Sequence, residues 1–359
     1  MIWWPLQALF VFAASTTLFD AIHFLLHKWA RSRFKLLRLA ASWHQVHHRF
    51  LDRGMQVHRN LIKANFWAHL VPEFVTTLMG TAIFLLVMPW QPVAFIAGVH
   101  CYFFVKHLYD EGIDVNHMAM KRVRGNRGVF RVDPSYHAMH HIQPTAFFSS
   151  FINVFDMIFG TALKLQGQRV TILGGTGSFG RAMAKRLMKA GAIVYIVGRE
   201  GLSNYSWAHN TDILILALGT RKEAEAFSIN LTEPVAAGEV FIDACRDRLV
   251  PAEIWGVGSE AEMFGGDIYA LSKSAFADYA AKFWARNPNV TYRHIVPSSF
   301  RSKLGWGPMS ANTVAAVSLF LIRRGFVYIP VTLTGVAFLN RILFGLRKHH
   351  GGKHVQSGA

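Results

Sequence analysis

Residues 169–180 read RVTILGGTGSFG, and this stretch decides the fold of the second half of the chain. The first five residues are mostly apolar or β-branched and predict a buried strand. Glycines follow at once, and an amphipathic segment over 181–190 then predicts a helix. A glycine-rich turn between a strand and a helix is typical of phosphate binding at a helix N-terminus. The predicted cofactor-binding residues here are Gly174, Thr176, Gly177, Ser178, Phe179 and Gly180.

Outward from this turn, short apolar strands alternate with amphipathic helices. Strands are expected at 193–197, 213–218, 240–242 and 294–296, and a further helix at 272–284. Such alternation predicts a parallel sheet, that is, an α/β Rossmann-like domain. The expected organisation is an α-helical membrane domain with histidine boxes over residues 1–165, the Rossmann-like domain over 166–330, and an apolar, then basic, tail over 331–359.

Two further features of this half carry chemistry. Arg199 follows the second predicted strand, where NAD-binding proteins have an acid. An arginine there favours the 2′-phosphate of NADP, so NADP(H) is the predicted cofactor. Tyr269 and Lys273 are spaced i, i+4 and share one helix face. The ammonium lowers the pKa of the phenol, which then exchanges a proton with an alcohol or carbonyl group.

The composition points to a membrane protein. The chain has 359 residues, of which 52% are hydrophobic and 16% charged, and its net charge is 38 − 21 = +17. Such a composition excludes a disordered or fibrous protein. The positive charge suits an anionic membrane surface or nucleic acid, but it clusters beside apolar runs, which argues for the membrane and against nucleic acid. Two cysteines form no disulfide framework, so a reducing compartment is expected.

Two long runs lack charged residues, at 2–19 and at 74–105. The first has no basic leader or cleavage site and is expected to be an anchor. Prolines at 89 and 92 break the second, which predicts a hairpin with arms at 74–88 and 93–107. A full crossing and a re-entrant hairpin both remain open, because each arm is shorter than the roughly 20 residues of a spanning helix. Basic clusters at 28–38 and 121–131 place the adjoining histidines and the Rossmann domain on the cytoplasmic face. The apolar stretch 326–346 is expected to lie on the second domain or at the bilayer surface.

Histidines are concentrated in the first half of the chain. Three clusters share the spacing of one helix face. They comprise His23 and His27, then His44, His47 and His48, then His137, His140 and His141. The pattern H-x-x-H-H occurs twice, which chance placement of 18 histidines would not be expected to give. Neutral imidazole is the commonest nitrogen ligand of iron, zinc and copper, so these clusters predict two metal ions.

The boxes resemble those of the fatty acid hydroxylase/sterol desaturase superfamily over roughly residues 15–163. The Trp43-His44 context and the later Asn153, Asp156 and Phe159-Gly160-Thr161 carry the resemblance further. Members of that family are membrane di-iron enzymes that use O₂ to hydroxylate or desaturate lipids. The resemblance implies two iron ions held by the eight box histidines and by His117. His58, His69, His100 and His107 remain open as ligands or as structural histidines.

The implied chemistry suits these residues. Attack on an unactivated C–H bond requires O₂ activation by a metal, which no side chain supplies. A site beside the membrane admits a lipid directly from the bilayer. Zinc would use similar ligands for hydrolysis, but nothing in the sequence suggests a hydrolytic substrate. No flavin, haem or iron–sulfur motif is visible, so an external electron donor is expected as a partner.

Residues 166–330 resemble the short-chain dehydrogenase/reductase family. The resemblance implies catalytic roles for Tyr269, Lys273, Asn230 and Ser259, and cofactor contacts at Ala217 and Gly219. The chain departs from the family between Arg199 and Asp212, where a strand–helix unit is cut down or lost. Ser259 lies ten residues before Tyr269, closer than is usual in the family.

The whole chain resembles bacterial bifunctional sterol desaturase/short-chain dehydrogenase proteins. This resemblance implies a membrane-bound oxidoreductase that oxidises a fatty acyl or sterol-like lipid with O₂ and interconverts alcohol and carbonyl with NADP(H). One alternative is a hydroxylase whose Rossmann module is not catalytic. Another is an aldehyde-processing, alkane-forming enzyme similar to those of plants.

Overall fold

The computed structural model describes residues 3–125, 128–202 and 204–350. The chain divides between Leu163 and Lys164 into two compact units, and the short stretch around Gly125 belongs with the second. Each unit is described by itself.

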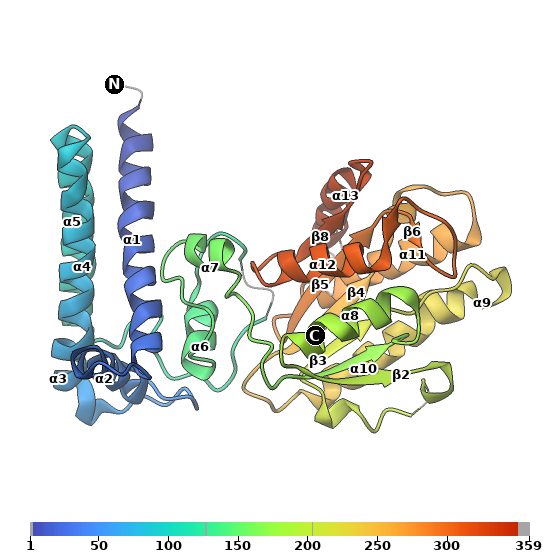
Figure 1. Ribbon diagram of the computed structural model, residues 1–359, viewed down its shortest axis with the longest axis horizontal. Helices are drawn as coiled ribbons and strands as arrows, with labels where there is room; N and C mark the ends of the chain where they lie inside the picture. The colour runs from blue at the N-terminus through green and yellow to red at the C-terminus, as the bar shows by residue number, and fades with distance from the viewer. Residues whose placement is uncertain (1–2, 126–127, 203, 351–359) are drawn as a thin grey trace. The chain divides into compact units, whose positions relative to one another are not determined.

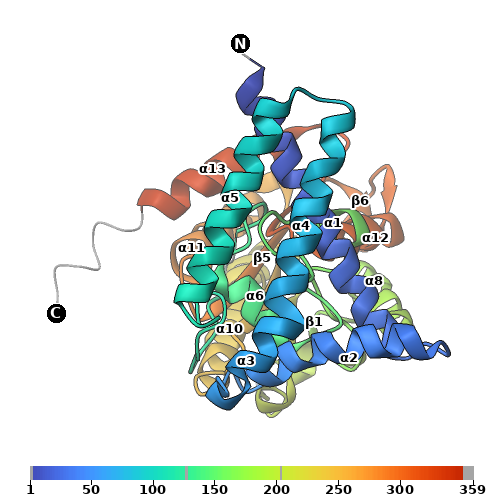
Figure 2. The same cartoon turned by 90° about the vertical axis from the view of Figure 1, so that its left-hand side faces the viewer.

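Long apolar helices dominate the first unit (Figures 1 and 2). Helix α1 spans Trp4–Trp29, and a second, continuous helical stretch runs over Arg59–Leu86. Within the described residues, both are long and apolar enough to cross a membrane. The second stretch comprises η1 (Arg59–Leu61), α3 (Ile62–Asn65), η2 (Phe66–Leu70), α4 (Val71–Ala82) and η3 (Ile83–Leu86).

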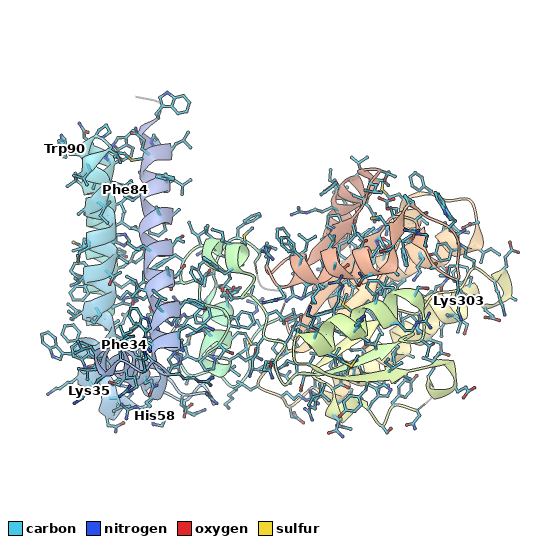
Figure 3. The ribbon with its side chains drawn as sticks, viewed as in Figure 1. Phe34, Lys35, His58, Phe84, Trp90 and Lys303 are labelled. Carbon is cyan, nitrogen blue, oxygen red and sulfur yellow. The ribbon has the colours of Figure 1, made fainter. Side chains whose placement is uncertain are left out.

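A hairpin joins α4 to α5 (Trp90–Tyr109), close to the arms that the sequence predicts. Pro89 is the N-cap of α5, where a missing backbone N–H has no cost. Phe84 and Trp90 lie at this tip of the hairpin, whereas Phe34, Lys35 and His58 lie at the opposite end of the long helices (Figure 3). Trp90 is 65% exposed, which is typical of an aromatic residue at a membrane interface.

Shorter helices gather at the end of α1 that carries His23 and His27. They are α2 (Lys35–Phe50), α6 (Pro134–Ile142) and α7 (Val154–Phe159). The buried carboxylate of Asp156 holds α6 and α7 in place. It accepts hydrogen bonds from the Tyr136 hydroxyl at 2.6 Å and from the Ser149 backbone N–H at 2.8 Å, and also from the Thr161 hydroxyl. This network gives a structural reason for the Asn153–Thr161 motif.

The second unit is built on a parallel sheet of six strands in the order β2-β1-β3-β4-β5-β8. The strands are β1 (Arg169–Leu173), β2 (Ile193–Val197), β3 (Ile213–Leu216), β4 (Ala252–Val257), β5 (Val290–Pro297) and β8 (Tyr328–Val331). β6 (Phe300–Arg301) and β7 (Met309–Ser310) form a separate short pair. The strand order reverses between β1 and β3, and the crevice at such a point is where doubly wound sheets bind ligands.

Helices cover both faces of this sheet (Figure 1). α8 (Ser178–Lys189) and α12 (Ala311–Ile322) pack together on one face. The other helices are α9 (Glu223–Phe227), α10 (Glu233–Ala244), α11 (Ile268–Tyr279) and α13 (Val336–His350), with short turns η4 (Arg199–Gly201), η5 (Ala208–Asn210), η6 (Ser228–Thr232), η7 (Glu260–Met263) and η8 (Ala280–Trp284). The expected α/β Rossmann-like fold is confirmed.

The structure corrects two sequence expectations for this unit. Residues 240–242 are not a strand but part of α10, whose first turn contains Pro234. Three consecutive apolar residues suit either element, and the buried face of α10 uses Phe241. The missing strand is β4, at Ala252–Val257. Among the described residues between β2 and β3 only η4 and η5 remain, so the expected loss of a strand–helix unit is found there, and β2 becomes the sheet edge.

The end of the chain packs on the second unit, which is one of the two positions expected for the apolar stretch 326–346. β8 completes the sheet beside β5, and α13 packs against β8, η7, α11 and η8. The separate segment predicted from residue 331 is therefore, as far as His350, an integral part of the second unit. The sequence suggested a tail because α13 is apolar on more than one side.

Candidate functional site

Five imidazoles converge in a first group. They belong to His23 and His27 of α1, His44 and His48 of α2, and His140 of α6. One ligand atom from each lies within 4.8 Å of all the others. The Nε2 atoms of His27 and His44 are 2.9 Å apart, and those of His140 and His48 are 3.2 Å apart. Nitrogens bound about 2.1 Å from one ion lie roughly 3 Å from each other, so this spacing fits a shared metal.

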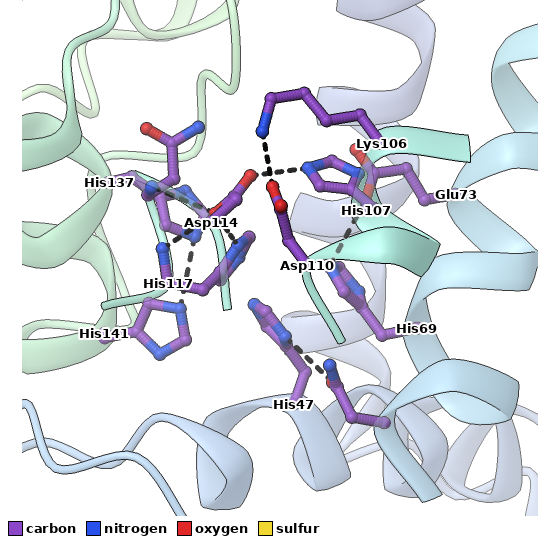
Figure 4. A network of polar contacts seen from close by, with 12 residues as sticks. His47, His69, Glu73, Lys106, His107, Asp110, Asp114, His117, His137 and His141 are labelled. Carbon is purple, nitrogen blue, oxygen red and sulfur yellow. Dashed lines mark hydrogen bonds and ion pairs between the residues drawn. The ribbon is translucent and has the colours of Figure 1, made fainter. Parts of the chain in front are cut away.

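Four imidazoles form a second group (Figure 4). They belong to His47, His117, His137 and His141, and their ligand atoms also lie within 4.8 Å of one another. The Nε2 atoms of His137 and His141 are 3.2 Å apart. The structure thus brings together all nine histidines that the sequence proposes as ligands.

Each H-x-x-H-H box is divided between the two groups. On α2, His44 and His48 face the first group and His47 the second. On α6 the division is reversed, with His140 in the first group and the other two histidines in the second. The groups are neighbours, because the ring centroids of His48 and His141 are 4.7 Å apart. The arrangement offers two adjacent nitrogen-rich sites.

Backbone carbonyls fix the orientation of two of these rings. His140 donates from Nδ1 to the Ala146 carbonyl at 2.8 Å, and His141 donates from Nδ1 to the Leu51 carbonyl at 2.8 Å. A carbonyl only accepts, so the proton is on Nδ1. The Nε2 lone pair of each ring is then directed at its group, as metal-binding histidines require.

Side chains do the same for two others. The Nδ1 atoms of His47 and His117 face Asn65 Oδ1 at 3.2 Å and Asp114 Oδ1 at 2.7 Å. Asp114 also pairs with His107 (Figure 4). Burial opposes ionisation of Asp114, but the hydrogen bonds from His107 and His117 outweigh it and hold the pKa of this carboxyl below its usual range.

The donor set fits metal ions. Burial, reinforced mostly by neighbouring imidazoles, holds the pKa of His44, His47, His48, His137 and His141 well below the usual range, and burial lowers that of His140 to about 4. These rings are therefore neutral at pH 7, the form that binds metal. Among the described residues, both ring nitrogens of His23 and the Nε2 atoms of His47 and His117 are buried without a hydrogen-bond partner. Metal ions would satisfy one nitrogen of His23 and the Nε2 atoms of His47 and His117.

The remaining histidines take other contacts. His69 stacks on His47 with ring centroids 3.6 Å apart and faces Glu73 at 3.3 Å, but it belongs to neither group. His100 contacts the Ser15 hydroxyl at 3.2 Å, and His58 pairs with Asp52 near the surface. A cavity of about 140 Å³ adjoins the second group and is lined by His117, His137, Glu73, Phe103 and Asn116, among others. It leaves room for small reactants beside these imidazoles.

The second unit has a pocket of about 380 Å³ at the reversal point of its sheet. It is lined by Gly174, Thr176, Gly177, Ser178, Phe179, Gly180, Ala217, Gly219, Ser259, Tyr269 and Lys273, all of them predicted site residues. The turn after β1 requires glycine. A Cβ on Gly174, whose φ is +78°, would lie 2.6 Å from the Ala217 carbonyl oxygen, and one on Gly180 would lie 2.5 Å from the Gly174 carbonyl oxygen. The close backbone leaves a cradle that suits a dinucleotide phosphate.

Lys273 and Tyr269 lie together in this pocket. The Lys273 ammonium donates to the carbonyls of Val257 at 3.0 Å and Leu218 at 3.2 Å. Burial lowers the pKa of Lys273 to about 8. Burial also raises the pKa of Tyr269, but a hydrogen bond with Ser259 and the charge of Arg221 offset part of that rise. Ser259 therefore reaches the phenol in spite of its short spacing.

One predicted residue, Asn230, does not line the pocket. It is buried in η6. Its Nδ2 donates to Thr220 O at 3.0 Å and to Ser272 Oγ at 2.9 Å, so it braces the backbone near the site. Arg199 begins η4, but its side chain lies outside the described part of the structure.

Sequence reasoning missed several residues of both sites. Asn65 orients His47, and no motif marks it. Arg221 lies 5.1 Å from the Tyr269 ring centroid, in a cation–π contact. Lys303, Leu304 and Trp306 line the pocket from a loop between β6 and β7. The only available signal was their position after a strand that follows the Tyr–Lys helix.

The two units together define an oxidoreductase. In the sequence, a histidine-rich helical domain precedes a Rossmann domain. Residues 8–161 match the model of the fatty acid hydroxylase family, so the first unit contains a fatty acid hydroxylase domain. That family is membrane-associated and implies a di-iron centre, a lipid substrate and O₂. The resemblance drawn from the histidine boxes is confirmed.

The chain is also similar to individual proteins. It is 26% identical to monoglucosyldiacylglycerol epimerase of Synechocystis sp. over 89% of this chain and 90% of that protein. A short-chain dehydrogenase of Burkholderia cenocepacia in complex with NADP is 14% identical and covers 52% of this chain and 99% of its own, with a TM-score of 0.43. An oxidoreductase of the same family from Burkholderia thailandensis is 17% identical and covers 50% and 96%, with a TM-score of 0.41.

Proposed function

We propose that the chain is a membrane-embedded enzyme with two redox sites. The first oxidises a C–H bond of a lipid with O₂ at two iron ions held by the nine histidines. The second transfers hydride between NADP(H) and an alcohol or carbonyl group beside Tyr269. The observation that carries this proposal is the convergence of nine imidazoles into two adjacent groups.

In the first site, the protein holds neutral imidazoles in fixed orientations. The carbonyls of Ala146 and Leu51, with Asn65 and Asp114, keep protons on Nδ1 and direct Nε2 inward. Bound iron would supply the activation of O₂. The cavity beside His117 and His137 would receive the small reactants.

The balance of this reaction requires a partner. Hydroxylation places one oxygen atom of O₂ into the C–H bond and releases the other as water, so two electrons and two protons must be supplied. A desaturation removes two hydrogens from the lipid and needs the same two electrons to form two water molecules. We assign the electrons to an external donor protein, because the sequence has no flavin, haem or iron–sulfur motif.

In the second site, the pyrophosphate of NADP(H) would lie at the N-terminus of α8, and Arg199 would favour the 2′-phosphate. Tyr269 would donate a proton to a carbonyl oxygen as hydride arrives, or accept it from an alcohol in the reverse direction. Ser259 and Arg221 lower the cost of the phenolate, and the positive charge of Lys273 in the same pocket would add to this effect.

The basic clusters at 28–38 and 121–131 support an orientation with the histidine groups on the cytoplasmic side of the membrane. There, cytoplasmic reductants and NADP(H) are available to both sites.

A second candidate function is epimerisation of a glycolipid. The Synechocystis relative is named for an epimerase of monoglucosyldiacylglycerol. A Tyr–Lys site can invert a carbinol carbon without net redox change. Bound NADP(H) would supply the hydride acceptor and then the hydride donor, and Tyr269 would take up the alcohol proton and return it after the ketone has turned its opposite face to the cofactor.

The two functions differ in their products. Purified protein would be incubated with membrane lipid extract, NADPH and a reconstituted electron donor, with O₂ uptake and lipid masses measured. Lipids heavier by one oxygen or lighter by two hydrogens, lost in a His140→Ala variant, support the oxygenase. An isobaric product with altered sugar stereochemistry and no O₂ uptake supports the epimerase and overturns the oxygenase.

A further inference from the structure

Helix α13 has a buried face that fixes it to the second unit. Ala337 and Asn340 are fully buried and Phe344 nearly so. The Asn340 Nδ2 donates to Glu262 Oε2 at 2.9 Å, and the Phe344 ring stacks on that of His294 with centroids 4.6 Å apart. The Tyr328 hydroxyl donates to the Ala337 carbonyl at 3.0 Å. The helix is therefore anchored along its length and is not a loose tail.

The outward face of α13 is apolar as well. Phe338, Leu339, Ile342 and Leu343 are 58%, 59%, 62% and 38% exposed. Their spacing of i, i+1, i+4 and i+5 places them in one stripe along the helix. Leu333, just before the helix, is 67% exposed. A helix on a soluble domain normally turns polar residues to water, so this stripe calls for an apolar partner.

Cations accompany this stripe. α13 contains Arg341, Arg347 and Lys348 and no acidic residue. Arg341 and Lys348 are exposed. A surface helix with an exposed apolar stripe, basic residues beside it and no acidic residue is typical of helices that lie in the interface of an anionic membrane. A protein partner would need an apolar surface that is also acidic.

We propose that α13 docks in the surface of an anionic bilayer, with Phe338, Leu339, Ile342 and Leu343 inserted below the headgroups and Arg341 and Lys348 bound to lipid phosphates. The chain itself carries helices long and apolar enough to span such a bilayer, so this partner is always within reach. The inference rests on the proposed function only for the attachment of the chain to a membrane.

A chain of short contacts connects α13 to the hydride-transfer pocket. Asn340 on the buried face binds Glu262, whose Oε1 accepts from the Ser259 backbone N–H at 2.7 Å. Ser259 in turn contacts Tyr269. The membrane-facing helix and the pocket are thus parts of one rigid assembly, and a docked α13 would hold the pocket at the lipid surface from which its substrate comes.

The test uses the full chain in vesicles with a fluorophore at Ile342→Cys. Cys101→Ser removes the exposed cysteine, and Cys245 is buried. The matched control carries the label at Glu223→Cys, on the exposed surface of α9. Vesicles of phosphatidylcholine and phosphatidylglycerol contain bromine on the acyl chains, and iodide is the aqueous quencher.

We expect bromolipid to quench the label at residue 342 several-fold more than the label at 223, and iodide to do the reverse. The difference should shrink in vesicles of phosphatidylcholine alone. Quenching of residue 342 by iodide but not by bromolipid would overturn the proposal. Shielding from both quenchers would overturn it too, because the stripe would then be covered by the first unit or by a second copy. None of these outcomes depends on catalytic activity.

Discussion

The two sites of this protein are built in opposite ways. The histidine centre draws on α1, α2, α6 and the segment after α5, and each of its imidazoles points inward from a regular helix or is held by a hydrogen bond. The pocket of the second unit is formed where strands end, with Trp306 81% exposed on its lining. Helix spacing determines the first site, whereas sheet topology determines the second. The histidine site is therefore largely buried, whereas the pocket of the second unit has an exposed lining.

The strongest test of the two separate histidine groups is to remove their members in pairs. His27→Ala with His44→Ala removes two members of the first group only, and about one metal ion per chain should remain. His47→Ala with His48→Ala removes one member from each group, so the affinity for both ions should fall and O₂-dependent activity should be lost. Metal per chain by mass spectrometry, on protein with wild-type circular dichroism, measures this.

The grouping would be wrong if both double variants retained equal metal. The single variant His58→Ala is the matched control. His58 pairs with Asp52 near the surface and should bind metal as the wild type does.

The second site should fail independently of the first. Tyr269→Phe removes the proton donor and should lower NADPH-dependent carbonyl reduction about 10²- to 10⁴-fold. Its metal content and O₂ uptake should stay at the wild-type level. Tyr279→Phe, which loses only a hydrogen bond to Glu239, is the control and should keep its reductase rate. If Tyr269→Phe left every product unchanged, the Rossmann unit would be a non-catalytic module.

Residues that orient the predicted ligands should affect metal affinity less than the ligands themselves. Asp114→Asn weakens the acceptor that orients His117 and should lower metal affinity about 10- to 100-fold. Asp110→Asn is the matched control, because Asp110 pairs with Lys106 and touches no ligand in the described structure. Competition with a chelator measures both. Equal affinities in the two variants would show that Asp114 does not support the centre.

The sequence predicts much of this molecule, for physical reasons that differ between its parts. Three boxes give eight of the grouped histidines, because i, i+3 and i+4 positions share a helix face. The division of each box between two groups depends on how α2 and α6 pack, which local spacing does not contain. Asn65 escapes notice because one amide at a helix end has no pattern.

In the second unit, the sequence predicts the turn after β1 and the Tyr–Lys pair, because both are local patterns. It does not predict β4, and it predicts a strand within what is helix α10. Burial on both sides makes a parallel strand and a buried helix alike in composition. The contact of Ser259 with Tyr269 depends on η7, whose capping box involves Glu262 and cannot be seen in the spacing to the tyrosine.

The smallest effect expected concerns Lys273 and pH. Burial lowers the pKa of its ammonium to about 8, so the protonated fraction falls from about nine-tenths at pH 7 to about one-tenth at pH 9. Burial raises the pKa of Tyr269, which therefore keeps its proton over this range. The rate of carbonyl reduction should thus fall several-fold between pH 7 and pH 9, as the positive charge that stabilises the developing phenolate is lost.

In Lys273→Arg the cation persists, and the profile should be flat at a lower rate. Lys282→Arg, on an exposed ion pair with Asp278, should keep the wild-type slope. A wild-type rate that stays constant from pH 7 to pH 9 would mean that the charge of Lys273 does not control the proton transfer. The buried histidine site and the exposed pocket of the second unit would then differ in geometry alone.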